Sequence, residues 1–222
     1  MKYTLAFDTT AAACSIALFA DEKYSDGFVK EMDFGQAETL IPEIDKLLKK
    51  HQLTFQEIDL LVVCTGPGSF TGVRSGISAA RAFGLACSHM EVLGITAFEG
   101  YTHALTYSPE EIAERNVVII ETKREDFYFQ IFDKHLQPIC PASAANREDI
   151  IKELRDKKVT FLGDGVERFL ATSTGLSLHA IKSAHFPDIK DIALCGIYKY
   201  HKKEHNYPKP LYLRAPDVCV KK

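Results

Sequence analysis

Two spacings of hydrophobic residues alternate along this chain and predict two halves of similar construction. Apolar runs typical of strands are separated by segments whose apolar positions recur every three or four residues, as on one face of a helix. The first half predicts strands at Tyr3–Asp8, Cys14–Ala20, Tyr24–Val29, Leu60–Cys64 and Val92–Ile95, and helices at 36–51, 69–86 and 97–105. The second half predicts strands at 116–121, 127–132 and 159–162, helices at 146–157, 166–172 and 188–204, and an extended tail at 208–216.

This order of elements indicates an α/β protein with two lobes. Each half reads as strands, a helix, a strand and a helix, so we expect a mixed sheet in each lobe, flanked by helices, with a cleft between the lobes. The segment Tyr107–Glu114 contains Pro109 and three glutamates and is the expected boundary. The predicted domains are therefore an N-terminal lobe, 1–106, and a C-terminal lobe, 107–222, whose tail, 208–222, packs back.

The turn after strand 60–64 is the first candidate for chemistry. Gly66, Pro67 and Gly68 form the turn, and Ser69 or Thr71 can cap the helix that follows. Such a turn can aim backbone N–H groups at an anion. A P-loop, however, needs a Gly-Lys-Ser/Thr sequence, and a dinucleotide-binding loop needs a glycine where Thr71 stands. The sequence therefore favours a capped structural turn over a phosphate site.

The tip of the first hairpin is a second candidate. Asp8, Thr9 and Thr10 end the first strand, where a carboxylate can hold a metal-bound water and hydroxyl groups can contact a phosphate. The alternative is that these side chains only satisfy the turn. We place a tentative nucleotide contact at these three residues and leave both readings open.

Small residues recur every four positions along the helix 69–86. Gly72, Gly76, Ala80 and Gly84 make one side of this helix almost bare. Each glycine costs about 1 kcal/mol relative to alanine in a helix, so close packing must compensate. The packing partner is either another part of this chain or another subunit.

Composition narrows the function classes. The formal net charge is −3, so no overall positive field would hold a nucleic acid. The six cysteines contain no CxxC pair and read as reduced, mostly buried thiols of a cytoplasmic protein. No apolar run is long enough to span a bilayer. The N-terminal stretch superficially resembles a lipoprotein signal, but the charge of Asp8 interrupts its apolar part and argues against one.

Neither a metal site nor a hydrolase site is predicted. His201 and His205 have the i, i+4 spacing of metal ligands, but Lys202, Lys203 and Glu204 lie between them, so a solvated helix face is favoured. No Gly-x-Ser-x-Gly elbow is present, so a peptidase or esterase has no support. We expect no catalytic residue, no metal and no cofactor of the chain's own.

Five segments resemble one known family. Gly66-Pro-Gly-Ser-Phe-Thr-Gly-Val-Arg74 is the most specific, and the others are Phe7-Asp-Thr-Thr10 with Cys14-Ser15, Leu40–Ile44, Gly94–Thr96 and Pro210–Pro216. Over essentially its whole length the chain resembles the TsaB (YeaZ) family, which takes part in making threonylcarbamoyladenosine in tRNA. The resemblance implies the actin/Hsp70/sugar-kinase-like fold.

The resemblance also implies a non-catalytic role. Members of this family bind TsaD, whose metal-bearing site transfers the threonylcarbamoyl group to tRNA adenosine, and TsaE joins as an ATPase. A protein of this kind is a homodimer when alone and contacts tRNA only through the complex, and ATP or ADP would lie in the lobe cleft or at the junction with TsaD. Carried over to this sequence, the partner interface comprises Gln36, Leu40, Ile44, Leu47, Gly72, Gly76, Ala80 and Gly84.

Two departures from the family pattern leave alternatives open. The family often has histidine where Gln36 stands, and its pattern is lost at 121–126, near Glu121-Thr-Lys-Arg124. The metal-binding histidines of TsaD have no counterpart here. The alternative functions are an ATP-hydrolysing enzyme that uses Asp8 and, ranked last, a peptidase that acts on its partner.

Overall fold

The first half of the chain builds one five-stranded mixed sheet. The structure is a computed structural model that describes residues 1–154, 156–172 and 175–214. The strand order of this first sheet is β3-β2-β1-β4-β5, and its strands are antiparallel from β3 to β1 and parallel from β1 to β5. The elements are β1 (Tyr3–Asp8), β2 (Ala13–Ala20), β3 (Lys23–Glu31), α1 (Gln36–Lys50), β4 (Leu60–Cys64), α2 (Phe70–Ala86), β5 (Glu91–Ile95) and α3 (Ala97–His103).

The second half repeats this topology. Its sheet has the order β10-β9-β6-β7-β8, which places the strands of this half in the same spatial order as those of the first. Its elements are β6 (Arg115–Glu121), β7 (Phe127–Phe132), β8 (Ser143–Ala145), α4 (Arg147–Glu153), β9 (Lys158–Leu162), α5 (Val166–Leu170), β10 (Ser177–Lys182) and α6 (Ile189–Lys202). Three short 3₁₀ helices lie at Phe55–Glu57, Ala104–Tyr107 and Pro109–Glu111.

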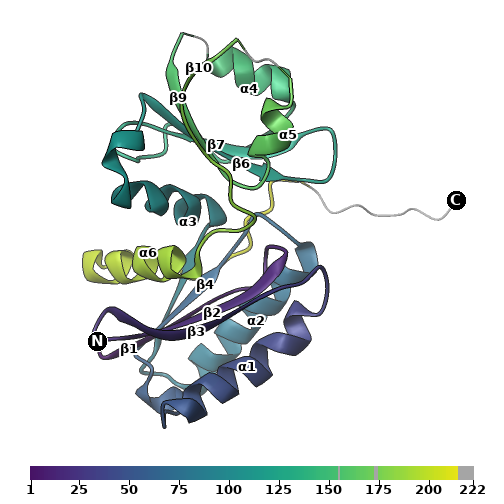
Figure 1. Cartoon of the computed structure of the whole chain (residues 1–222). Coiled ribbons are helices and arrows are strands. Elements are labelled where there is room, and N and C mark those ends of the chain that lie inside the picture. Colours follow the sequence, from purple (N-terminus) through teal and green to yellow (C-terminus); the bar gives the residue numbers. More distant parts are fainter. Residues whose placement is uncertain (155, 173–174, 215–222) are drawn as a thin grey trace, which may run out of the picture.

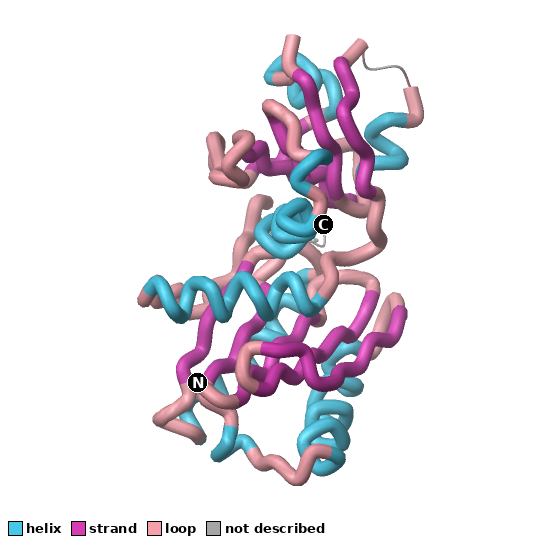
Figure 2. Tube along the Cα trace, turned by 60° about the vertical axis from the view of Figure 1, so that its left-hand side comes forward, coloured by secondary structure: helices cyan, strands magenta, loops and turns pink. Residues whose placement is uncertain are grey.

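The two sheets are parts of a stack of five layers (Figure 1). Helices α1 and α2 cover the outer face of the first sheet, α3 and α6 lie between the two sheets, and α4 and α5 cover the second sheet. Figure 2 shows the same separation of the two groups of strands from another direction. The alternating side chains of each strand explain the layers: Leu5 and Phe7 face α1, whereas Ala6 faces the central helices.

The central helices cross between the halves. Although α6 follows the second sheet in sequence, it packs across β1, β4 and β5 of the first sheet. Gly196 permits this close approach, because a Cβ there would lie 2.3 Å from a methyl group of Val62. Helix α3 packs on α6 and contacts β6 of the second sheet. The strands of the two sheets divide at the predicted boundary, 106/107, but α3 and α6 lie between both sheets. The boundary therefore stays a prediction.

Two edge strands were not predicted from the sequence, and three predicted helices are longer than the helices in the structure. β8 and β10 were not expected, because β8 has only three residues and neither strand contains a buried residue. The helices predicted to reach Lys157, Thr172 and Glu204 end at Glu153, Leu170 and Lys202. The tail is irregular from 203 to 212, and the part of it from 215 to 222 lies outside the described residues.

Candidate functional site

The hairpin tip between β1 and β2 is buried and internally bonded. Asp8, Thr9 and Thr10 are each at most 2% exposed. The backbone N–H of Thr10 donates to Asp8 Oδ1 at 2.6 Å, and Thr9 Oγ1 donates to the carbonyl oxygen of Gly72 at 2.7 Å. Burial raises the pKa of Asp8, and hydrogen bonds from Thr10 oppose this shift. The side chains of Asp8 and Thr9 are thus committed to the fold, and Thr10 alone of the three lines the cavity where the hairpin tips of the two halves meet.

The Gly66–Gly72 turn packs directly on this tip. The N–H of Ser69 donates to the carbonyl oxygen of Thr10 at 2.7 Å, and Ser69 Oγ caps α2 by accepting from the N–H of Gly72 at 3.2 Å. A Cβ on Gly68 would lie 2.2 Å from the carbonyl oxygen of Thr10. The expectation of a capped structural turn is confirmed, with Ser69 as the cap. Because glycine has no Cβ, Gly68 lets the backbone of the turn approach the backbone of the hairpin tip.

The small-residue ridge of α2 faces the protein's own core, which corrects its assignment as a partner surface. A Cβ on Gly72 would lie 1.9 Å from the carbonyl oxygen of Thr9, and one on Gly76 would lie 2.7 Å from Thr9 Oγ1. Ala80 is fully buried, and Gly84 packs on Val92. Of the two explanations for the ridge, packing within the chain is therefore the one that the structure supports.

The apolar residues assigned to the partner interface in α1 are also in the core. Leu40, Ile44 and Leu47 are at most 6% exposed and pack on the strands of the first sheet. Gln36 is 8% exposed and its Nε2 donates to the carbonyl oxygens of Met32 and Ala11 at 3.0 and 3.3 Å. A partner cannot reach these side chains without unfolding the helix, so the residue assignment is corrected while an interface on the same helices stays a prediction.

Helices α1 and α2, which contact each other, also carry exposed residues, and we call this set of residues the outer helix face. Leu85 is 84% exposed and Ile41 is 45% exposed. The other members are small and exposed: Ala37, Ser78 and Ala82. The sequence signal that could have identified them is their i, i+4 and i+7 spacing, Ser78, Ala82 and Leu85, on the side of α2 away from the glycines.

A cavity of about 330 Å³ lies where the hairpin tips of the two halves meet. Thr10 and Tyr101 line it from the first half, and Glu121, Lys123 and Asp164 line it from the second. Asp164 Oδ1 accepts the N–H of Glu121 at 2.9 Å. Burial raises the pKa of Asp164 to about 6, and the nearby charge of Glu121 adds to the shift. Sequence reasoning missed Asp164, although the Gly163-Asp-Gly165 turn after a strand was visible.

Replacing Asp164 tests this environment. Its pKa in the folded state, about 6, exceeds the ordinary value of 3.8, so the folded state binds the proton more tightly and stability falls as pH rises from about 4 to about 6. Asp164→Asn keeps an oxygen acceptor for Glu121 and removes the buried charge. We expect the variant to be about 2 kcal/mol more stable than the unmodified protein at pH 7.5, and similar to it at pH 4. Urea unfolding at the two pH values measures this, and an equal difference at both would contradict it.

The histidines at i, i+4 spacing engage separate carboxylates. His201 Nε2 lies 2.7 Å from Glu22 Oε1, and His205 Nδ1 lies 2.7 Å from Glu91 Oε1. Among the described residues no cluster of three or more metal-ligating side chains is found. The five described cysteines are free thiols. No described helix is both long and apolar enough to cross a membrane.

The comparisons with known proteins agree with this architecture. The model of the family described as TsaD, tRNA N6-adenosine threonylcarbamoyltransferase, matches residues 35–217. The tRNA threonylcarbamoyladenosine biosynthesis protein TsaB of Buchnera aphidicola is 34% identical over 97 residues, 43% of each chain. TsaB of Haemophilus influenzae is 32% identical over 128 residues, 56% of this chain and 51% of that one, so this chain spans about half the length of these two relatives. TsaB of Bacillus subtilis is 24% identical over 233 residues, 98% of this chain and 96% of that one.

Solved structures with this fold include YeaZ from Pseudomonas aeruginosa, with a TM-score of 0.78, 19% identity and coverage of 96% of this chain and 100% of that one. A ROK hexokinase from Thermus thermophilus has a TM-score of 0.51, 10% identity and coverage of 90% and 100%. The duplicated sheets with shared central helices define an actin-like ATPase and sugar-kinase fold. The chain belongs to the family that the TsaD model describes and, within it, to the TsaB (YeaZ) group. The predicted fold class and family are confirmed.

Proposed function

We propose that this chain is a non-catalytic subunit that binds and activates a TsaD-type tRNA N6-adenosine threonylcarbamoyltransferase. The observation that carries the proposal is the outer helix face. Its two large apolar side chains, Leu85 and Ile41, are exposed on helices whose other faces are fixed in the core. A rigid surface with exposed apolar residues among small ones is typical of a protein interface.

The state of the hairpin tip supports a non-catalytic role. The alternative in which Asp8 acts in ATP hydrolysis would need its carboxylate free at the cavity, but Asp8 is buried and accepts the N–H of Thr10. Of the three predicted nucleotide contacts, only Thr10 lines the cavity. In this proposal ATP or ADP lies at the junction with TsaD.

The names of the relatives supply the reaction. Curated relatives are named as tRNA threonylcarbamoyladenosine biosynthesis proteins, and the matching family model describes the transferase. In this proposal TsaE joins as a third subunit, tRNA is contacted only through the complex, and the free chain forms a homodimer through the outer helix face. All of these components act in the cytoplasm.

Mass measurement by light scattering tests the association. We expect the chain alone to have the mass of a dimer, and an equimolar mixture with TsaD to have the mass of a one-to-one complex. If the two proteins elute separately at micromolar concentration, with and without ATP, the proposed binding is wrong.

A further inference from the structure

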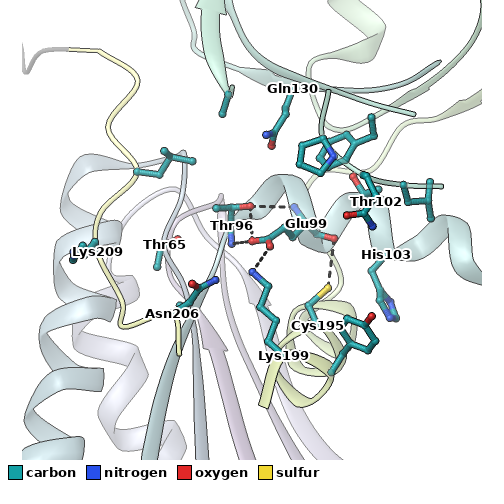
Figure 3. A pocket seen from close by; sticks show the side chains of 18 of the residues that line it. Thr65, Thr96, Glu99, Thr102, His103, Gln130, Cys195, Lys199, Asn206 and Lys209 are labelled. Atoms are coloured by element: carbon teal, nitrogen blue, oxygen red, sulfur yellow. Dashed lines mark hydrogen bonds and ion pairs between the residues drawn. The ribbon is translucent and has the colours of Figure 1, made fainter. Parts of the chain in front are cut away.

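A second cavity, larger than the one at the hairpin tips, has no role in the proposed function. It measures about 960 Å³, and its walls come from α3, α6, β7 and the segment 205–211 that follows α6 (Figure 3). Helix α3 separates it from the smaller cavity: Ala97 and Tyr101 line the smaller one, whereas Glu99 and His103 line the larger one. The outer helix face contributes none of its residues to either cavity.

One wall of this cavity is fixed by hydrogen bonds to the first sheet. The N–H of Gly94 donates to the carbonyl oxygen of Asn206 at 2.7 Å, and the N–H of Leu211 donates to that of Thr65 at 3.0 Å. A side-chain bond from Arg81 Nη2 to the carbonyl oxygen of Pro208, at 2.7 Å, holds the segment between them. The cavity is thus preformed, as ligand cavities usually are.

The charge of the lining favours an anion. Lys199 Nζ donates to Glu99 Oε1 at 2.5 Å, and the other oxygen of Glu99 accepts from the N–H and the hydroxyl of Thr96 at 2.8 and 2.9 Å. Glu99 is the only described carboxylate in the lining, and it is already satisfied, whereas Lys209 adds a second cation. The side chain of Lys199 is 15% exposed, and no other described acceptor takes its remaining N–H groups. Such donors bind carboxylate or phosphate oxygens.

Two side-chain amides face the same space. Figure 3 shows Gln130 projecting into the cavity from β7 and Asn206 projecting into it from the opposite wall. Gln130 Nε2 donates to the carbonyl oxygen of Cys140 at 3.3 Å. A carboxamide presents a donor and an acceptor in one plane, which matches the edge of a nucleobase. The rings of Tyr198 and Tyr207, 60% and 55% exposed, also line the cavity and offer faces on which a base can stack.

We propose that this cavity binds a nucleoside monophosphate, either free or as one nucleotide of an RNA chain. Lys199 contacts the phosphate, the amides of Gln130 and Asn206 contact the base edge, and a tyrosine stacks on the base. The volume, about 960 Å³, is within the range of small-molecule cavities. The proposal does not depend on TsaD binding, because the two surfaces share no residue.

Isothermal titration calorimetry of the full chain tests this site. The probes are adenosine 5′-monophosphate, adenosine, inorganic phosphate and a six-nucleotide single-stranded RNA. We expect the monophosphate to bind with a Kd below about 1 mM, and adenosine and phosphate each to bind about tenfold more weakly. Tighter binding of the RNA assigns the site to an RNA chain, and weaker binding assigns it to a free nucleotide. No heat with any probe at millimolar concentration, or equal affinity for phosphate alone, overturns the proposal.

Matched variants locate the binding. Lys199→Met should weaken monophosphate binding about tenfold or more, because a charge-assisted contact is lost. Lys190→Met, on the same helix but outside the cavity, should leave binding unchanged. Because Lys199→Met also leaves Glu99 unpaired and can destabilise the fold, Gln130→Leu is a second variant, and we expect it to weaken binding of the monophosphate but not of phosphate. Affinity unchanged in both variants would place the ligand elsewhere and overturn the assignment.

Discussion

Gly72→Ala is expected to destabilise the protein by about 3 kcal/mol, although it adds only one methyl group. The new Cβ would lie 1.9 Å from the carbonyl oxygen of Thr9 and 2.9 Å from its carbon, and these backbone atoms cannot move aside without breaking the hairpin tip. For a chain of this length, such a loss lowers the melting temperature by about 10 °C. Differential scanning calorimetry measures the change.

Gly84→Ala is the matched control on the same helix. Its Cβ would meet a methyl group of Val92 at 2.7 Å, and a side chain can rotate where a backbone carbonyl cannot. Because alanine also favours helix by about 1 kcal/mol over glycine, we expect a net change below about 1 kcal/mol. Equal losses for the two variants would mean that the ridge is not packed on the hairpin tip as described.

Ala82→Arg is expected to weaken association with TsaD strongly without changing the fold. Ala82 lies on the exposed side of α2, and alanine and arginine are both good helix formers. A charged, bulky side chain in the middle of an apolar contact excludes close packing, and we expect binding to weaken by about 2 kcal/mol or more, roughly 30-fold. Surface plasmon resonance against immobilised TsaD measures the affinity, and calorimetry checks the fold.

Ala171→Arg provides the control for that substitution. Ala171 is exposed at the end of α5, on the far side of the second sheet from α1 and α2. We expect it to bind TsaD like the unmodified chain. If Ala82→Arg binds TsaD as tightly as the unmodified chain does, the outer helix face is not the TsaD interface, whether or not the free chain forms a dimer.

Local patterns in the sequence were sufficient for most of the fold. The Ser69 cap and the alternating strands both depend on nearest neighbours, and the structure contains both of them. The edge strands β8 and β10 could not be predicted in the same way. Their pairing depends on β7 and β9, which lie next to them only after the second half has folded.

The candidate site was harder to predict because the same pattern has two physical meanings. The spacing of Gly72, Gly76 and Ala80 shows that something approaches α2 closely, but it cannot show that the neighbour is the carbonyl oxygen of Thr9, distant in sequence. Likewise, the apolar stripe of α1 marks a buried face without saying what buries it. The larger cavity was not predicted, since its walls combine four separate segments.

Reconstituted modification of tRNA tests the central claim most directly. TsaD, TsaE, ATP, the threonylcarbamoyl donor and tRNA are incubated with each form of this chain, and modified adenosine is measured by chromatography of the digested RNA. We predict modification with the unmodified chain and with Asp8→Asn, none without the chain, and strongly reduced modification with Ala82→Arg. Full modification with Ala82→Arg, or its loss with a folded Asp8→Asn variant, would contradict an account in which this chain acts by binding rather than by catalysis.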